Sequence, residues 1–376
     1  MKKNKVFFIS AASSIHTVKW VNSLSEDYEV HLIYCNNHQP KIDSVNKNVI
    51  LHKLHFKAPI GYYLNSIELR KLYKKIHPDI INVHYASGYG TLARISRIKP
   101  VLLSIWGSDV YDFPNQSKIK NRILKKNVNY AKSIASTSKG MAEELKKQVD
   151  TSKKEIYITP FGVDLKKFYH YNIERNDDNV NIGTIKALEG KYGIKDAILS
   201  IKKLKENLIK NGEEKLANHI KYYIYGDGSE KENLLQLIKS ENLEKDIFIM
   251  GKIPNEQVPA ILNKIDIFVA SSTANESFGV AVVEAMACEL PVVATNVDGF
   301  REVVDNNSTG YIVERNNIED IAEALEKLVK NKELRLKMGK NGKEKVIREY
   351  DWNKNVETMK KIYEKILKDN ERKNKK

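Results

Sequence analysis

Short apolar runs alternate with amphipathic helical stretches along this 376-residue chain, and the alternation occurs twice. In the first half, runs rich in Val, Ile and aromatic residues predict strands at 6–10, 30–34, 80–84, 101–105, 133–136 and 156–159. Helical spacing of apolar residues predicts helices between them, at 18–24, 66–75, 88–97, 118–129 and 140–149. Strands that are apolar throughout and alternate with helices indicate a parallel sheet covered on both faces.

The same pattern restarts near residue 181. Further strands are predicted at 181–185, 221–225, 247–250, 267–270, 292–294 and 310–313, with helices that include 194–209, 230–240 and 318–330. We therefore expect an α/β chain of two doubly wound, Rossmann-like domains that face a cleft. In such sheets ligands bind at the carboxyl ends of the strands.

Composition suggests where the domains begin and end. The predicted N-terminal domain is 1–168, and the stretch 169–180 is polar, has no apolar period and is interpreted as a linker. The second domain is predicted at 181–350. The remainder, 351–376, contains a helix at 353–368 that we expect to pack back towards the N-terminal domain, followed by a basic tail.

The net charge of +15 lies entirely in the first half of the chain. Residues 1–170 carry 28 Lys and Arg against 13 Asp and Glu, whereas the other 206 residues carry 35 of each. A basic half attracts an anionic partner, which can be a membrane surface, an acidic acceptor or a nucleic acid. For any single lysine, the alternative is that the chain is simply rich in lysine and that this residue lies on an ordinary solvated face.

The chain shows no sign of export or of membrane spanning. Cys35 and Cys288 are far apart and form no CxxC pair, which suits a reducing cytoplasm. The apolar run 6–12 is short and is soon followed by His16 and Lys19, so we interpret it as a first strand rather than a secretory signal. No uncharged apolar run reaches about 18 residues. We expect a cytoplasmic protein, peripheral on the inner face of the cell membrane.

The stretch 276–288 is the most informative for chemistry. Gly279 permits close backbone approach, and a helix is predicted to begin near Val280, so its free N–H groups suit a diphosphate. Glu284 lies in an otherwise apolar helix and Glu276 in the preceding loop. Because like charges repel, sugar and ribose hydroxyls are better partners for these carboxylates than phosphates. An ion pair on a partly exposed helix face is the alternative for Glu284.

Glu276-x7-Glu284, followed by Ala285-Met286-Ala287-Cys288 and 291–295, resembles the donor-site signature of retaining glycosyltransferases of the glycosyltransferase family 4 type. The resemblance extends through 183–191, 225–228, 299–302 and 310–313, and so covers the second domain. The first domain matches more loosely, at 10–16, 106–109 and 161–164. The family has the GT-B architecture of two Rossmann-like domains facing one cleft.

The resemblance implies a role for each matching residue. Lys186 and Lys191 would grip the diphosphate, although the family usually has Arg at the first position, and Lys lacks its planar fork. Glu276 would contact the donor sugar and Glu284 the ribose. The remaining donor-binding residues are Ser277, Phe278, Gly279, Gly226 and Gly228. A plain strand-to-helix turn is an equal alternative for the last two glycines.

Four residues of the first domain are candidates for the acceptor side. Trp106 stands where relatives often have His, and it either stacks on a sugar ring or caps the sheet. Asp109 either bonds the acceptor or pins its loop. His16 and His84 follow predicted strands and either contact the acceptor or leaving group or are structural.

The predicted activity is therefore transfer of a hexose or N-acetylhexosamine from a nucleotide-diphosphate sugar to a membrane-associated glycan or lipid-linked acceptor, with retention, in cell-surface polysaccharide biosynthesis such as that of lipopolysaccharide. No Asp-x-Asp motif and no His/Cys cluster with ligand spacing occurs, so no metal or other cofactor is expected. The alternatives are a nucleic-acid-binding protein, which the basic half favours but no recognised motif supports, and a GT-B phosphorylase or non-catalytic sugar-nucleotide binder.

Overall fold

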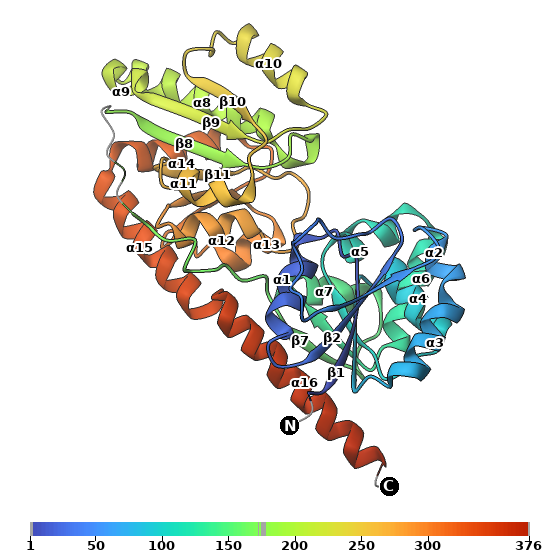
Figure 1. Ribbon diagram of the computed structural model, residues 1–376. Helices are drawn as coiled ribbons and strands as arrows, with labels where there is room; N and C mark the ends of the chain where they lie inside the picture. Colours follow the sequence, from blue (N-terminus) through green and yellow to red (C-terminus); the bar gives the residue numbers. More distant parts are fainter. Residues whose placement is uncertain (1–2, 172, 174–177, 375–376) are drawn as a thin grey trace. The chain divides into compact units, whose positions relative to one another are not determined.

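The computed structural model describes residues 3–171, 173 and 178–374 (Figure 1). The chain divides into two compact units, one made of Met1–Phe161 with Asn353–Lys376 and the other of Gly162–Trp352. Within the predicted linker 169–180, residues 172 and 174–177 lie outside the described residues. Each unit contains one parallel sheet, and the two are described separately.

The sheet of the first unit has seven parallel strands in the order β3-β2-β1-β4-β5-β6-β7. Its strands are β1 Lys5–Ile9, β2 Glu29–Cys35, β3 Ile50–Leu54, β4 Ile80–His84, β5 Leu102–Ile105, β6 Ser133–Ser136 and β7 Glu155–Ile158. The strand order reverses between β1 and β4. The carboxyl ends of these two strands therefore flank the topological switch point, where doubly wound sheets bind ligands.

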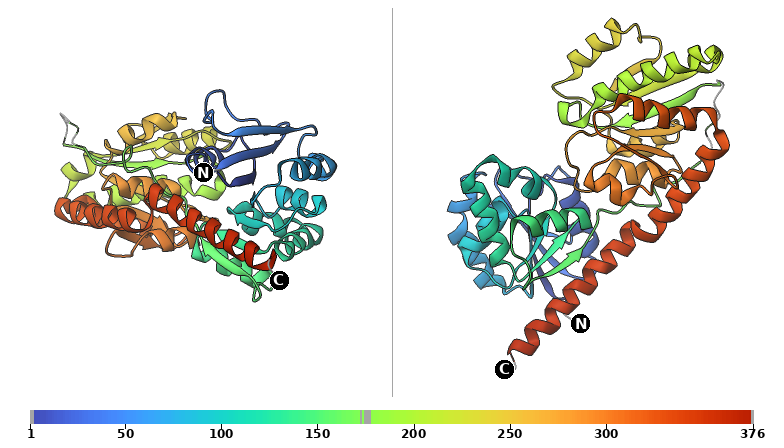
Figure 2. Two further views of the ribbon diagram at one scale, coloured as in Figure 1. Left: turned by 60° about the horizontal axis from the view of Figure 1, so that its bottom comes forward. Right: turned by 180° about the vertical axis from the view of Figure 1, so that it is seen from behind.

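Helices cover both faces of this sheet. They are α1 Ile15–Leu24, α2 Gly61–Leu64, α3 Ser66–Ile76, α4 Gly88–Ser96, α5 Ser108–Tyr111, α6 Lys118–Tyr130, α7 Lys139–Gln148 and α16 Trp352–Asn374. The views of Figures 1 and 2 agree that α3, α4 and α6 lie over one face and that α1 and α16 lie over the other. Tyr363 fixes α16 to the sheet, because its buried hydroxyl accepts a hydrogen bond of 2.8 Å from Asn82.

The second unit has a six-stranded parallel sheet in the order β10-β9-β8-β11-β12-β13. The strands are β8 Val180–Ile185, β9 Ile220–Tyr225, β10 Ile247–Gly251, β11 Ile267–Ala270, β12 Val292–Thr295 and β13 Gly310–Val313. The helices are α8 Ile194–Lys210, α9 Glu214–Asn218, α10 Lys231–Ser240, α11 Val258–Leu262, α12 Val280–Ala287, α13 Asp298–Val303, α14 Ile318–Lys330 and α15 Lys332–Glu349. Here the switch point lies between β8 and β11.

Every strand predicted from the sequence is present, with ends within one residue of those expected. Strand β3 and helix α15 are among the elements that were not predicted. Strand β3 lies at the sheet edge, where most of its side chains face solvent, so the run lacks the apolar character of the buried strands. Helix α15 is polar and packs through glycine: a Cβ at Gly339 would lie 1.9 Å from the carbonyl oxygen of Glu289. The two parallel sheets confirm the predicted fold class, whereas the cleft between the domains stays a prediction.

Candidate functional site

A pocket lies at the carboxyl ends of β8 and β11, at the switch point of the second sheet. It encloses about 330 Å³ of space, part of it open to solvent. Its walls come from the end of β8 with Lys186, from Tyr192, from the end of β11 with Ser272, and from the start of α12; the lining residues are Thr184–Lys186, Tyr192, Ile194, Phe268–Ser272, Gly279–Val282 and Phe300.

Helix α12 points its N-terminus at this pocket. Gly279 precedes the helix with φ of +95°, a conformation that L side chains rarely adopt, and a Cβ there would lie 2.8 Å from the Phe300 ring. Val280 and Ala281, the first two residues of the helix, line the pocket. The first N–H groups of a helix have no intrahelical acceptor and carry partial positive charge, so this wall suits an anion.

Lys186 and Glu276, both predicted as site residues, form an ion pair of 2.6 Å between Nζ and Oε1. The same carboxylate oxygen accepts a hydrogen bond of 2.8 Å from the Ser272 hydroxyl. The Lys186 ammonium also lies 4.2 Å from the centroid of the Tyr192 ring, within cation–π distance. A carboxylate, an aromatic face and a hydroxyl therefore hold the positions of both charged groups.

Lys191 shares the Tyr192 ring with Lys186, since its ammonium lies 5.1 Å from the same centroid. It also pairs with Glu189 at 3.3 Å. Burial opposes the charge of Lys191, but Tyr192 and Glu189 outweigh it and raise the pKa above its ordinary value. The Lys191 carbonyl accepts a hydrogen bond of 2.9 Å from the Thr273 N–H, which ties this loop to the one that carries Glu276. The structure thus brings the two predicted lysines and Glu276 together.

The two predicted glycines of the loop after β9 have a steric role. A Cβ at Gly226 would lie 1.8 Å from the Lys186 carbonyl oxygen, and one at Gly228 would lie 2.4 Å from that of Leu188. They permit this loop to run against the segment that begins at Lys186. The structure therefore supports the alternative of a sterically required turn, and contact with the donor stays a prediction.

The other predicted donor residues lie on or just before α12. Phe278 is buried and packs edge-on against Tyr350 at 5.3 Å, and a contact of its backbone with the donor stays a prediction. Ser277 and Glu284 are half-buried. Burial, followed by the negative charge of Glu284, raises the pKa of the Cys288 thiol to about 12. The ribose contact of Glu284 stays a prediction.

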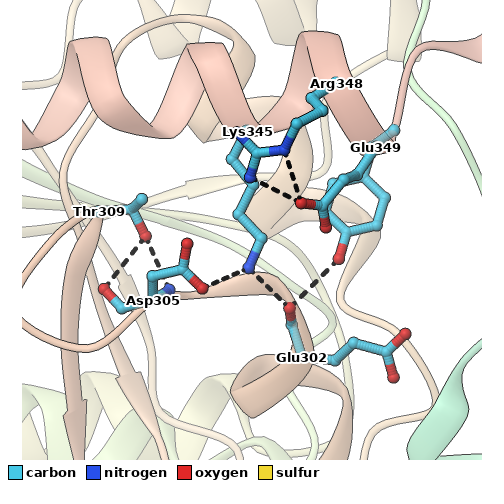
Figure 3. Close-up of polar contacts among 7 residues, drawn as sticks. Glu302, Asp305, Thr309, Lys345, Arg348 and Glu349 are labelled. Atoms are coloured by element: carbon cyan, nitrogen blue, oxygen red, sulfur yellow. Dashed lines mark hydrogen bonds and ion pairs between the residues drawn. The ribbon is translucent and has the colours of Figure 1, made fainter.

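A buried lysine connects α15 to the segment that supports this loop (Figure 3). The Lys345 side chain is 6% exposed, and its Nζ lies 2.6 Å from Asp305 and donates to the Glu302 carbonyl at 2.9 Å. The Tyr350 hydroxyl donates to the same carbonyl at 3.2 Å. Because Tyr350 also contacts Phe278, α15 braces the loop that carries the Glu276 side chain.

In the first unit, an aromatic cluster surrounds Trp106 at the carboxyl end of β5. Its ring centroid lies 4.4 Å from that of His84, 5.1 Å from Tyr85, 5.3 Å from Phe161 and 6.0 Å from His16. Trp106 is buried, and its ring packs against these neighbouring rings. Of the two alternatives for Trp106, its burial supports a cap on the sheet, and stacking on a sugar ring stays a prediction.

Asp109 holds the loop that follows Trp106. Its buried carboxylate accepts hydrogen bonds from the N–H groups of Ala86 at 2.8 Å, Gly107 at 2.9 Å and Trp106 at 3.1 Å. Burial raises the pKa of Asp109, and these three bonds oppose that rise. These bonds from the backbone support the loop-pinning alternative, and a contact of Asp109 with the acceptor stays a prediction.

The two candidate histidines differ in accessibility. His84 is fully buried 4.2 Å from the Phe8 ring, and within the described residues neither ring nitrogen has a hydrogen-bond partner. Burial lowers the pKa of His84 well below its ordinary value, which favours the structural alternative, and a contact with the acceptor or leaving group stays a prediction. His16 is half-buried and stacks on Phe161 at 4.1 Å. Burial, then Lys19, lowers the pKa of His16 to about 4, so its imidazole is neutral at neutral pH.

Sequence reasoning missed Tyr192, Ser272 and Phe161, which hold Lys186, Glu276 and His16. Phe161 begins the matching segment 161–164 and Tyr192 directly follows the matching segment 183–191, so these two carry a signal in the sequence, whereas Ser272 carries none. Among residues 3–171, 173 and 178–374, no group of three or more His, Cys, Asp or Glu side chains is arranged to hold a metal ion. Within the same ranges, none of the helices combines the length and apolar character needed to cross a bilayer.

Comparison with known families identifies both units. Residues 166–345 match the family described as glycosyl transferases group 1, and residues 5–138 match the family described as glycosyl transferase 4-like. The chain therefore belongs to the GT-B glycosyltransferases that combine these two domains.

Individual proteins resemble the chain over nearly its whole length. It is 29% identical over 362 residues to the uncharacterized glycosyltransferase MJ1178 of Methanocaldococcus jannaschii, with 94% of each chain covered. It is 26% identical over 401 residues to the capsular polysaccharide biosynthesis glycosyltransferase CapM of Staphylococcus aureus, covering 99% of this chain and 100% of CapM. The structure of Anabaena Alr3699/HepE in complex with UDP aligns with a TM-score of 0.75 at 14% identity, over 96% of this chain and 100% of that one, a likeness of fold.

Proposed function

We propose that this glycosyltransferase moves a hexose or N-acetylhexosamine, with retention, from a nucleotide-diphosphate sugar to a membrane-associated glycan or lipid-linked acceptor of a cell-surface polysaccharide. One observation carries the proposal: Lys186, Tyr192 and the N-terminus of α12 line one pocket, and two further charged groups contact this lining, Glu276 through its ion pair with Lys186 and Lys191 through the Tyr192 ring. This combination presents positive charge and N–H donors beside a hydroxyl-binding carboxylate. A nucleotide sugar is complementary to this arrangement, because its anionic diphosphate is joined directly to a sugar whose hydroxyls donate hydrogen bonds.

Charge explains how the pocket would accelerate transfer. When the bond between the anomeric carbon and the phosphate oxygen breaks, the leaving diphosphate gains negative charge. Lys186, Lys191 and the first N–H groups of α12 would stabilise that charge without reorganisation, because the pocket already holds them in place. Glu276, and by the family resemblance Glu284, would accept hydrogen bonds from sugar and ribose hydroxyls.

The proposed chemistry retains the anomeric configuration. The acceptor oxygen would bond to the anomeric carbon on the face that the diphosphate leaves, and the acceptor proton would pass to the departing phosphate oxygen. This route needs no enzyme nucleophile and no metal ion. His16, neutral at neutral pH, is the candidate of the first unit that remains accessible for the acceptor side.

Two relatives support the substrate classes. HepE, which shares the fold, was solved in complex with UDP, which supports a nucleotide-sugar donor. CapM is named for capsular polysaccharide biosynthesis, which supports a surface-glycan acceptor. The basic first half of the chain suits an acceptor that is anionic or held at an anionic membrane.

A thermal-stabilisation screen tests the donor site. UDP-glucose, UDP-N-acetylglucosamine and GDP-mannose are added to the wild-type protein, and a donor at 100 times its Kd should raise Tm by roughly 5 °C. Glu276→Ala and Lys191→Ala should lose most of that shift, whereas Lys210→Ala, at the far end of α8, should keep it. Equal stabilisation of all four proteins would contradict the site. The first anomer released when the donor is slowly hydrolysed, observed by proton NMR, tests retention.

A further inference from the structure

An exposed apolar ridge runs along α2 and the start of α3 in the first unit. Its members are Ile60, Tyr63, Leu64 and Ile67, whose side chains are 65%, 50%, 51% and 67% exposed. Four large apolar residues are therefore exposed within a stretch of eight, and exposed apolar patches on protein surfaces mark interaction sites. Neither the donor site nor the aromatic cluster around Trp106 uses these residues.

The spacing of the ridge places its members on one face. They stand at positions i, i+3, i+4 and i+7, the repeat of a single helical face. Asn65 separates α2 from α3: its N–H bonds the Gly61 carbonyl at 3.2 Å at the end of α2, and its carbonyl accepts from the Leu69 N–H at 2.9 Å at the start of α3. Gly61, Asn65 and Leu69 are buried at positions i, i+4 and i+8, so the exposed ridge residues lie on the outer side of both helices. The four side chains therefore project together.

The opposite face of the same helices is anchored to the protein. Gly61, Asn65 and Leu69 are buried, and the Asn65 side chain donates to the Phe56 carbonyl at 3.0 Å and accepts from the Phe56 N–H at 2.9 Å. Tyr62 packs edge-on against Tyr89 of α4 at 5.2 Å. Because this inner face is fixed, the ridge is a rigid surface and not a frayed segment that would collapse onto the core.

Positive charge flanks the ridge at both ends. Lys71 and Lys74 are exposed and continue the same helical face at four and seven residues after Ile67, and exposed Lys57 precedes Ile60. Between residues 44 and 78 the chain has seven Lys or Arg and a single carboxylate, that of Glu68, which accepts a hydrogen bond from the His55 N–H. An apolar centre between lysines matches a bilayer whose surface is anionic and whose interior is apolar.

We propose that this ridge docks the first unit onto an anionic lipid bilayer. Ile60, Tyr63, Leu64 and Ile67 enter the boundary between headgroups and acyl chains, and Lys57, Lys71 and Lys74 contact the lipid phosphates. A nucleic acid would suit the lysines but not the apolar centre. The inference deepens the proposed function, on which its biological meaning rests, by naming the surface that holds the enzyme beside a membrane acceptor.

Helix α6 provides a matched comparison. It carries the basic residues Lys120, Arg122, Lys125 and Lys126, and Ile119 is its strongly exposed large apolar residue. Both α3 and α6 carry several Lys and Arg residues, so charge alone does not distinguish them as membrane contacts. The structure adds a continuous apolar face beside α3, and this face is what distinguishes insertion into a bilayer from weak electrostatic attraction.

Vesicle co-sedimentation tests the ridge with the full chain. Wild-type protein should bind vesicles of phosphatidylcholine with 30% phosphatidylglycerol and bind pure phosphatidylcholine much less. Leu64→Ser with Ile67→Ser should lower the partition coefficient at least tenfold and remove the binding that persists at high salt. Lys71→Gln with Lys74→Gln should lower it about tenfold or more at low salt, since each lysine near the surface contributes roughly fivefold. Lys125→Gln with Lys126→Gln, on α6, should stay within about twofold of wild type.

A fluorescence probe tests insertion directly. The natural tryptophans Trp20, Trp106 and Trp352 are buried, so a Trp introduced by Tyr63→Trp reports on the ridge. Its emission should shift to the blue when anionic vesicles are added. Wild-type binding that the ridge variants leave unchanged, or an unshifted emission, would overturn the proposal. Self-association of the wild-type protein that the ridge variants abolish, without vesicle binding, would assign the ridge to a second copy instead.

The result of the vesicle-binding test can be distinguished from the result of the donor-binding test. Ridge variants with native circular dichroism and an unchanged Tm should keep the full stabilisation by nucleotide sugars. Loss of vesicle binding with intact donor stabilisation isolates the ridge. Absence of donor stabilisation in a wild-type protein that binds vesicles would instead count against the proposed function alone.

Discussion

Lys186 Nζ lies 2.6 Å from Glu276 Oε1, so the proposed diphosphate-binding cation and the proposed sugar-binding carboxylate neutralise each other in the unliganded protein. A donor diphosphate would take over part of the attraction on Lys186. The Glu276 oxygens would then be available to accept hydrogen bonds from sugar hydroxyls.

Glu276→Gln should therefore separate the two parts of the donor. The change removes the competing negative charge from Lys186, so we expect the Kd of the nucleoside diphosphate to stay equal or fall a few-fold. The extra affinity that the sugar provides should be lost, and the transfer rate should fall by about 100-fold or more. Titration calorimetry with the diphosphate and with its sugar form measures both effects. Parallel weakening of both ligands would show that Glu276 does not face the sugar.

Tyr192 should control diphosphate affinity without touching the diphosphate. Its ring lies under both lysine ammoniums, at 4.2 Å for Lys186 and 5.1 Å for Lys191. Partly exposed cation–π contacts contribute about 0.5–1 kcal/mol each, so Tyr192→Leu should weaken nucleoside diphosphate binding by roughly 5–30-fold. Tyr192→Phe keeps the ring and should stay within about threefold of wild type. Equal losses in the two variants would exclude the ring as the cause.

The strands could be predicted because a buried strand is a largely apolar run in the sequence. Continuous apolar runs such as β4 and β11 are buried on both faces, and a local window detects them. Strand β3 is stabilised by pairing with β2 at the edge, and α15 by close glycine contacts with its neighbours. Both depend on a partner distant in the sequence, which no local pattern records.

The site residues also divide into those that the sequence identified and those whose role depends on contacts distant in the sequence. Residue types at matching spacing identified Lys186, Lys191 and Glu276, because a diphosphate and a sugar require those charges. The sequence left the roles of Trp106 and Asp109 open and could not tell His84 from His16. Which histidine is fully enclosed depends on packing by Phe8 and Trp106, and this becomes known only when the strands are assembled.

Lys345 should stabilise the second unit substantially. Its ammonium bonds Asp305 and the Glu302 carbonyl, and Lys345→Met leaves both groups without this donor while it keeps the volume of the chain (Figure 3). We expect the free energy of unfolding to fall by roughly 1–3 kcal/mol. Lys340→Met, at an exposed position on the same helix, should change it by less than about 0.5 kcal/mol. Chemical denaturation measures both, and equal midpoints would show that the buried bonds are not stabilising.

Glu289 has a backbone conformation that favours glycine. Its φ is +61°, in the left-handed region, and its side chain pairs with Lys343 at 2.7 Å. Glu289→Ala loses the ion pair and keeps the strained backbone, whereas Glu289→Gly loses the pair and relieves the strain. The glycine variant should therefore unfold with a free energy about 1 kcal/mol higher than the alanine variant. The reverse order in denaturant titrations would mean that the strain is not present in solution.

Acid should destabilise the first unit through histidines whose pKa burial lowers, among them His52 and His16. Burial, followed by His31 and Lys75, lowers the pKa of His52 to about 4, and burial with Lys19 does the same for His16. In the unfolded chain a histidine has a pKa near 6.5, so the unfolded state binds protons first as the pH falls. The free energy of unfolding should thus be unaffected by these groups above about pH 6.5 and should fall between pH 6.5 and 4, by at most about 1.4 kcal/mol per pH unit for each histidine. His52→Gln should reduce the slope of the unfolding free energy against pH by up to about 1.4 kcal/mol per pH unit, which corresponds to one proton. Lys210→Gln should leave this slope unchanged. Denaturation midpoints recorded at half-unit steps measure the slope, and an identical slope in wild type and His52→Gln would refute the assignment.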